Sequence, residues 1–137
     1  MASNTSYNNK KGKKSQKKID LGSAEIHVLS TFNNIIVSLT DHAGNLFYQC
    51  SSGMVGASGS KKASSYFASM VINKVLEKAR LFNVKAISVV FKGPGINGRD
   101  AVVKVLNENG NNFAITSLKD FTPVPHNGCR SRKRRRA

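Results

Sequence analysis

The stretch Asn34–Thr40, which reads Asn-Ile-Ile-Val-Ser-Leu-Thr, decides the fold of this chain. It is β-branched and mostly apolar, a composition typical of a central β-strand. On its N-terminal side, Glu25–Ser30 alternates between apolar and polar residues. On its C-terminal side, the turn formers at Asp41–Asn45 precede a third candidate strand over Leu46–Cys50. Three strands joined by short turns predict an antiparallel meander.

Two helices and two further strands are predicted beyond the meander. Apolar residues recur at i+4 over residues 64–82, which indicates an amphipathic helix. Ala86–Phe91 has the composition of a buried strand, Asp100–Asn109 that of a second helix, and Phe113–Leu118 that of a last strand. The order βββαβαβ predicts an α/β domain in which helices pack on a mixed β-sheet, in two or three layers.

Charge is distributed unevenly along the 137 residues, which carry a formal net charge of +15. Residues 1–18 hold six lysines and residues 126–137 hold six basic side chains, without an acid in either run. The part between them carries only +3. We therefore expect a basic arm over 1–18, a single domain over 19–121 and an extended basic arm over 122–137. Both arms should be disordered in the free protein, because the like charges within each arm repel one another and each arm has almost no apolar side chains to bury.

Composition excludes several classes of protein. No apolar run reaches the roughly 18 residues of a membrane span, and residues 1–18 lack the apolar segment of a secretion signal. Two cysteines, Cys50 and Cys129, are too few for a disulfide framework and favour a reducing, cytoplasmic location. An organellar transit peptide is the alternative for residues 1–18, but such peptides favour arginine and an amphipathic helix.

The acid-free arms favour a polyanionic partner. A solubility device is the plainer alternative, and a membrane surface lacks the apolar face that it would need beside these charges. Nucleic acid is the better candidate, and arginine suits bidentate contact with phosphate. If about ten cations met duplex phosphates, log K would fall with log salt at a slope of roughly −9. The cations of the C-terminal arm are Arg130, Arg132, Lys133, Arg134, Arg135 and Arg136.

Two glycine-rich loops with basic residues each follow a predicted strand and precede a predicted helix. Glycine lets backbone N–H groups approach a phosphate, and a helix N-terminus adds a positive dipole; plain turn chemistry is the alternative. Neither loop has Walker A spacing, and the near match to a dinucleotide fingerprint at 93–98 is interrupted by proline, so we expect no cofactor. The candidate contacts are Gly53, Gly56, Gly59, Ser60, Lys61 and Lys62 in the first loop and Lys92, Gly93, Pro94, Gly95, Gly98 and Arg99 in the second.

The residue pattern gives little support to a catalytic function. The histidines His27, His42 and His126 lack metal-ligand spacing, and a nucleophile–base pair of Cys129 and His126 would sit in a basic tail without a pocket. The acidic residues lie at predicted turns and helix surfaces, whereas a two-metal nuclease needs carboxylates that converge at one end of a sheet. We therefore expect no catalytic residue, no metal and no small-molecule substrate.

The segment Pro123–Arg130 reads Pro-Val-Pro-His-Asn-Gly-Cys-Arg and is the most unusual in the chain. Alternate prolines enforce an extended path. Asn127 and Gly128 form a turn dipeptide, and glycine does not hinder attack of its nitrogen on the asparagine amide. The sequence therefore predicts isoaspartate formation at Asn127.

Several of these motifs together resemble the S-eleven family of small-subunit ribosomal proteins, over about residues 20–137. The most specific is Thr122–Arg130 with its basic end. The others are Ile35–Asp41 with Gly44 and Asn45, Lys92–Gly95, Ser30–Asn34 and Gly59–Lys62. The chain departs from the family pattern at Ile96–Asn97, where its loop is one residue longer, and the motifs that carry the resemblance do not extend into residues 1–18.

The resemblance implies a ribonuclease-H-like fold without the nuclease carboxylates. It also implies binding to ribosomal RNA on the platform of the small subunit, near the messenger RNA exit path and the start-site pairing cleft. The platform proteins numbered seven and eighteen would be neighbours. Isoaspartate, known in the family, would map onto Asn127. The Lys and Asn bias of residues 1–18 resembles that of an AT-rich bacterial genome.

The sequence as a whole predicts a non-catalytic constituent of the small ribosomal subunit that supports assembly and translation. Its RNA contacts would come from the two glycine-rich loops, the C-terminal cations and a set of asparagines and their neighbours: Asn33, Asn34, His126, Asn127, Gly128 and Cys129. Two alternatives stay open: a free architectural nucleic-acid-binding protein, and a metal-dependent nuclease using Asp41 or Asp100.

Overall fold

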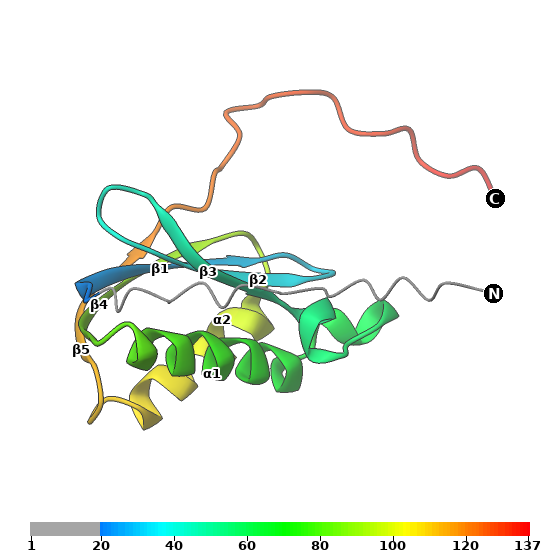
Figure 1. Ribbon diagram of the computed structural model, residues 1–137. Coiled ribbons are helices and arrows are strands. Elements are labelled where there is room, and N and C mark those ends of the chain that lie inside the picture. Colours follow the sequence, from blue (N-terminus) through cyan, green and yellow to red (C-terminus); the bar gives the residue numbers. More distant parts are fainter. Residues whose placement is uncertain (1–19) are drawn as a thin grey trace, which may run out of the picture.

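The computed structural model describes residues 20–137, which form a five-stranded sheet and two α-helices (Figure 1). The element order confirms the predicted βββαβαβ, with two short 3₁₀ turns, η1 and η2, added after the third strand. The expected arm over 1–18 lies outside the described residues. The elements are β1 (Gly22–Ser30), β2 (Ile35–Thr40), β3 (Leu46–Ser51), η1 (Ser52–Val55), η2 (Gly59–Ala63), α1 (Ser65–Leu81), β4 (Val84–Lys92), α2 (Ile96–Glu108) and β5 (Ala114–Asp120).

The sheet is mixed, with the strand order β3-β2-β1-β4-β5. β1, β2 and β3 pair antiparallel, as the predicted meander requires, whereas β4 and β5 add in parallel on the other side of β1. The stretch Ile35–Thr40 forms an interior strand between β3 and β1, as its composition predicted. The meander leaves one edge of β1 and one edge of β3 open, and the crossover through α1 adds β4 beside β1.

Both helices pack on the same face of the sheet, which gives two layers (Figure 1). Alternate residues of β1, namely Ala24, Ile26 and Val28, are fully buried in the core that these helices share. Burying an aliphatic side chain of this size stabilises a fold by about 1.5–3 kcal/mol. The other face of the sheet carries half-exposed residues, Glu25 and His27 among them, and no helix of the described chain covers it.

The helix α2 begins at Ile96, four residues before the predicted start at Asp100. Gly98 and Arg99 therefore lie in its first turns and not in a loop. Gly98 is buried, and its missing Cβ lets the helix approach the side chains of Ser30 and Ile35. Glycine and asparagine at these positions hide the helix start from a sequence pattern, because both are weak helix formers.

Candidate nucleic-acid interface

One edge of the sheet gathers all the loops that the sequence singled out. β1, β4 and β5 are parallel and end at this edge, which we call the carboxyl edge. β2 starts there and β3 ends there, because Ser30 pairs with Ile35 and Ile36 with Ser51. The turn 31–34, the segment 52–64, the loop 93–95 and the start of the C-terminal arm therefore meet at one end of the molecule.

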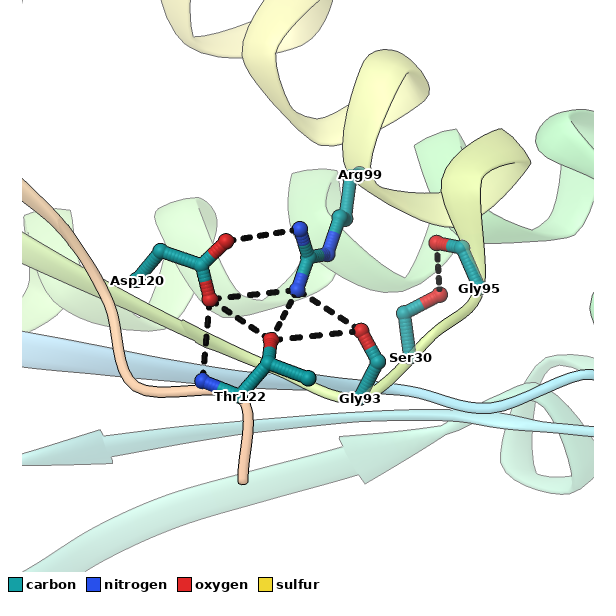
Figure 2. Close-up of polar contacts among 6 residues, drawn as sticks. All are labelled: Ser30, Gly93, Gly95, Arg99, Asp120 and Thr122. Atoms are coloured by element: carbon teal, nitrogen blue, oxygen red, sulfur yellow. Dashed lines mark hydrogen bonds and ion pairs between the residues drawn. The ribbon is translucent and has the colours of Figure 1, made fainter. Parts of the chain in front are cut away.

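The glycines of the second loop pack around Ser30. The Ser30 hydroxyl donates to the carbonyl oxygen of Gly95 at 2.8 Å (Figure 2), and the Gly95 N–H donates to the carbonyl oxygen of Ser30 at 2.9 Å. A Cβ at Gly93, Gly95 or Gly98 would overlap atoms of Ser30, and Gly93 also has a positive φ of 97°. Close packing thus accounts for these three buried glycines, whereas Lys92 and Pro94 are exposed.

Arg99 is engaged inside the protein (Figure 2). Its Nη1 donates to Asp120 Oδ2 at 2.8 Å, and its Nη2 donates to the Gly93 carbonyl oxygen at 2.7 Å and to the Thr122 hydroxyl. The Thr122 hydroxyl and N–H donate in turn to Asp120 Oδ1 at 2.6 and 3.0 Å. We call these four residues the Arg99 clamp. The clamp joins the helix α2, the glycine-rich loop and the first residue of the C-terminal arm.

The pKa of Asp120 lies below the ordinary carboxyl value. The hydroxyl and N–H of Thr122 contribute most to this shift, because they hydrogen-bond to the ionised carboxylate, and Arg99 adds its own hydrogen bond and positive charge. Asp120 is consequently ionised at neutral pH. Since the charge of Arg99 faces this carboxylate, the guanidinium expected to meet an RNA phosphate is already paired.

The turn 31–34 is built by Thr31 and Asn34. The Thr31 hydroxyl oxygen accepts from the Asn34 N–H at 3.0 Å, and Asn34 Oδ1 accepts from the Ile35 N–H at 2.9 Å. Asn34 is half-buried and uses its amide oxygen inside the turn, whereas Asn33 is exposed. Phe32, which lies between Thr31 and Asn33, is 76% exposed. Sequence reasoning did not select Phe32, although an aromatic residue inside a short polar turn is itself a signal of a contact surface.

The first glycine-rich loop is closed by Ser52. Its hydroxyl donates to the Lys62 carbonyl oxygen at 2.6 Å, and its carbonyl oxygen accepts from the Ala57 N–H at 3.1 Å. Gly56 ends the first 3₁₀ turn with a φ of 93°, a conformation that favours glycine. Of the predicted contacts in this loop, Lys62 is half-buried and the others are exposed, namely Gly53, Gly56, Gly59, Ser60 and Lys61.

The C-terminal arm leaves the Arg99 clamp without forming a helix or strand, and Pro123–Ala137 is exposed throughout. In Figure 1 the arm runs on the side of the sheet opposite the helices. His126, Asn127, Gly128, Cys129 and all six cations of the arm are solvent-exposed. Asn127 has a φ of 54°, the left-handed conformation that a turn at Asn-Gly uses. The structure thus brings the start of the arm to the loops but leaves its cations free of the domain.

The acidic residues of the nuclease alternative lie far apart in the fold. Asp41 sits at the opposite edge of the sheet, where the Asn45 N–H and Nδ2 each donate to its carboxylate at 2.9 Å and lower its pKa. Asp100 lies on α2, next to the carboxyl edge. Residues 20–137 contain no group of three or more His, Cys, Asp or Glu side chains that could hold a metal ion. This arrangement does not build a two-metal site.

The thiols differ in their surroundings. Cys50 is buried, and burial raises its pKa, which keeps the thiol protonated. Cys129 is free and exposed on the arm. None of the helices that the structure describes is long and apolar enough to cross a membrane.

Comparison with known proteins agrees with this arrangement. Residues 24–136 match the family model described as Ribosomal protein S11. A small ribosomal subunit protein uS11 from Kosmotoga olearia is 41% identical over 136 residues, which cover 99% of both chains. The protein of the same name from Chlamydia caviae is 44% identical over 93% of this chain and 94% of its own. The one from Thermotoga maritima is 42% identical over 90% and 92%.

These relatives share a name that denotes a ribosomal constituent and not an enzyme, and the match runs through the whole described domain and into the basic arm. The resemblance first seen in Thr122–Arg130 is therefore confirmed over nearly the full length. The mixed sheet with its packed helices is consistent with the ribonuclease-H-like fold that the resemblance implied. The chain belongs to the ribosomal protein S11 family of the small ribosomal subunit.

Proposed function

We propose that this chain binds small-subunit ribosomal RNA through its carboxyl edge and its C-terminal arm, as a structural constituent that supports assembly and translation. The observation that carries the proposal is the Arg99 clamp, which fixes the start of a six-cation arm beside the exposed loops of one edge. An anchored arm enters RNA from a defined point and direction, whereas a free tail would lose more conformational entropy on binding.

The residues fall into two roles in this proposal. Exposed lysines and arginines neutralise phosphates, and exposed asparagines and backbone groups hydrogen-bond to sugars or base edges. Arg99, Gly93, Gly95 and Gly98 position the loops and the arm. The proposed RNA contacts are Asn33, Asn34, Gly53, Gly56, Gly59, Ser60, Lys61, Lys62, Lys92, Pro94, His126, Asn127, Gly128, Cys129, Arg130, Arg132, Lys133, Arg134, Arg135 and Arg136.

The position of the chain within the small subunit is also proposed. The family supports a position on the platform, near the messenger RNA exit path and the start-site pairing cleft, with the platform proteins numbered seven and eighteen as neighbours. The three relatives described above are bacterial, which favours the cytoplasmic ribosome of a bacterium.

Co-sedimentation with small subunits in high salt tests this proposal. The full chain should remain with the small subunit, and a variant in which all six arm cations are replaced by glutamine should be released at lower salt, because it forms fewer phosphate contacts. Replacement of the exposed residues Asn73, Lys74 and Glu77 of α1 by glutamine is the control. A chain that sediments away from small subunits and binds duplex DNA as tightly as RNA would instead be a free architectural protein.

A further inference from the structure

Three large side chains are exposed around one end of the molecule, and one of them, Tyr66, also meets the ring of Phe67 edge-on with centroids 5.2 Å apart. Phe32 in the turn 31–34 is 76% exposed, Ile96 at the start of α2 is 69% exposed, and Tyr66 at the start of α1 is 68% exposed. They come from three separate segments that the fold brings to the carboxyl edge. Scattered exposed apolar residues are ordinary, so their meaning depends on what lies between them.

Two adjoining hollows connect these side chains. The smaller, of about 220 Å³, is lined by Phe32, Ala63, Pro94, Ile96 and Asn97. The larger, of about 430 Å³, is lined by Tyr66, Ser69, Asn97, Asp100 and Lys104. Asn97 lines both, so the two hollows lie side by side, and we call them together the Phe32–Tyr66 surface, with the residues Phe32, Ile96, Asn97 and Tyr66.

Closely packed glycine residues line part of the smaller hollow. Gly95 and Gly98 line it, and both are held against Ser30 by the contacts described above. Its volume is below the roughly 300–1,000 Å³ of pockets that enclose drug-sized ligands. A hollow of this size, walled by a phenyl ring and bordered by an amide, suits one flat group that stacks and hydrogen-bonds at its edge.

We propose that the Phe32–Tyr66 surface binds unpaired nucleotides of RNA, with bases stacked on Phe32 and Tyr66 and hydrogen-bonded by the Asn97 amide. This inference rests on the proposed RNA binding and specifies which form of RNA the carboxyl edge takes. Aromatic rings exposed beside basic residues are the usual means by which proteins hold unstacked bases. A paired helix cannot use this surface, because its bases are already stacked on one another.

Charge determines how the strand lies. The two charged residues of the larger hollow, Asp100 and Lys104, are of opposite sign, so the hollow itself offers phosphate no net positive charge. The sugar–phosphate backbone therefore runs outside it, along exposed Lys61 and half-buried Lys62 next to Ala63. Only the uncharged bases enter. Six of the seven residues that line the larger hollow carry a hydroxyl, amide or charged group, which favours a nucleotide over the wholly apolar face of a protein partner, since such a face would leave these groups unpaired.

Binding assays with the full chain and two RNA probes test the proposal. One probe is a hairpin with an unpaired loop, and the other is a fully paired duplex with the same number of phosphates. Phe32→Ala and Tyr66→Ala should each weaken hairpin binding by roughly fivefold to hundredfold, the range expected for loss of one stacked base. Binding to the duplex and the salt slope should not change, because neither side chain carries charge.

Three controls make the result specific. Phe32→Trp keeps a stacking ring and should retain hairpin binding, whereas Phe32→Leu keeps only apolar bulk and should not. Leu81→Ala removes an equally exposed apolar side chain at the other end of α1, where Leu81 is 72% exposed, and should have no effect. All three replaced side chains lie on the surface, so folding should be retained, as circular dichroism can verify.

Each other outcome overturns the inference in its own way. Equal hairpin affinity for the wild type and Phe32→Ala would show that no base stacks there, while salt-dependent RNA binding would leave the proposed function intact. Hairpin binding retained by Phe32→Leu would show that apolar bulk and not base stacking is what the site needs. Small subunits that carry Phe32→Ala but lack a neighbouring protein would identify a protein contact. Absence of any RNA binding by the wild type would overturn the proposed function itself.

Discussion

Arg99 Nη1 lies 2.8 Å from Asp120 Oδ2, and this ion pair joins the start of α2 to the last residue of β5 across 21 positions of sequence. The guanidinium also reaches the Gly93 carbonyl oxygen and the Thr122 hydroxyl. One side chain therefore holds together the glycine-rich loop, the edge strand and the root of the C-terminal arm.

Arg99→Ala should lower the free energy of unfolding by about 1–3 kcal/mol, because it removes charge-assisted hydrogen bonds to three acceptors. Arg99→Lys should recover little, since one ammonium group cannot match the planar geometry of the guanidinium. Urea denaturation measures the loss, and limited proteolysis should cut the arm faster near Thr122. Wild-type stability in Arg99→Ala would mean that the clamp does not hold the arm.

Acid should weaken the clamp through Asp120. Its pKa is lowered in the folded state, so its stabilising contribution is complete above the ordinary carboxyl pKa of 3.8 and is lost as pH falls through the lower folded value. Denaturation series from neutral to acidic pH should show a shallower acid loss for Asp120→Asn than for the wild type. Asp41→Asn is the matched comparison, because the pKa of Asp41 is also lowered but at the opposite edge of the sheet. If Asp120→Asn lost stability with falling pH as steeply as the wild type, Asp120 would not be the group through which acid weakens the clamp.

Gly98→Ala should destabilise the fold by roughly 1–3 kcal/mol through overpacking. The new Cβ would overlap the Ser30 hydroxyl, so Ser30→Ala should relieve part of the loss in the double variant. Gly93→Ala should resist the same rescue, because its Cβ would meet the Ser30 backbone and its φ is 97°. Gly128→Ala, whose Cβ has only an ordinary 3.6 Å contact, is the control and should be neutral.

The C-terminal arm should set the salt dependence of RNA binding. Truncation before Arg130 removes six cations, so the slope of log K against log salt should become shallower by about 4–5, at roughly 0.7–0.9 per phosphate contact. Filter binding at several salt concentrations measures the slope. An unchanged slope would exclude the arm from the RNA interface.

Asn127 should form isoaspartate faster than the other Asn-Gly sites of the chain. Asn127 lies on an exposed arm outside helices and strands, whereas Asn97 lies in α2 and the Asn109 side chain donates to the Val105 carbonyl oxygen at 2.9 Å. The succinimide needs the Gly nitrogen to reach the Asn side-chain carbon, which regular structure prevents. Peptide mapping of aged protein should detect the product at Asn127 first; only unmodified Asn127 there would refute the prediction.

Local sequence patterns were sufficient to predict most of the helices and strands. The apolar runs around Val37, Val89 and Val75 identify strands and a helix, because burial imposes a period of two or of about four on the sequence. The start of α2 was missed, since Gly98 is a poor helix former whose value lies in its contact with Ser30. The place of β4 beside β1 was not predicted, because strand order depends on where the crossover lands and not on composition.

The sequence by itself determined the element order, the family and the two acid-free arms, since these depend on residue type and spacing alone. Only the tertiary structure decided that Arg99 faces Asp120 and not solvent. It also decided that three glycines pack closely against Ser30. The fold alone brings Phe32, Ile96 and Tyr66 to the same surface. The physical reason is distance in sequence. Contacts between residues tens of positions apart arise from the pairing of β1 with β4 and of β4 with β5, and no local pattern encodes them.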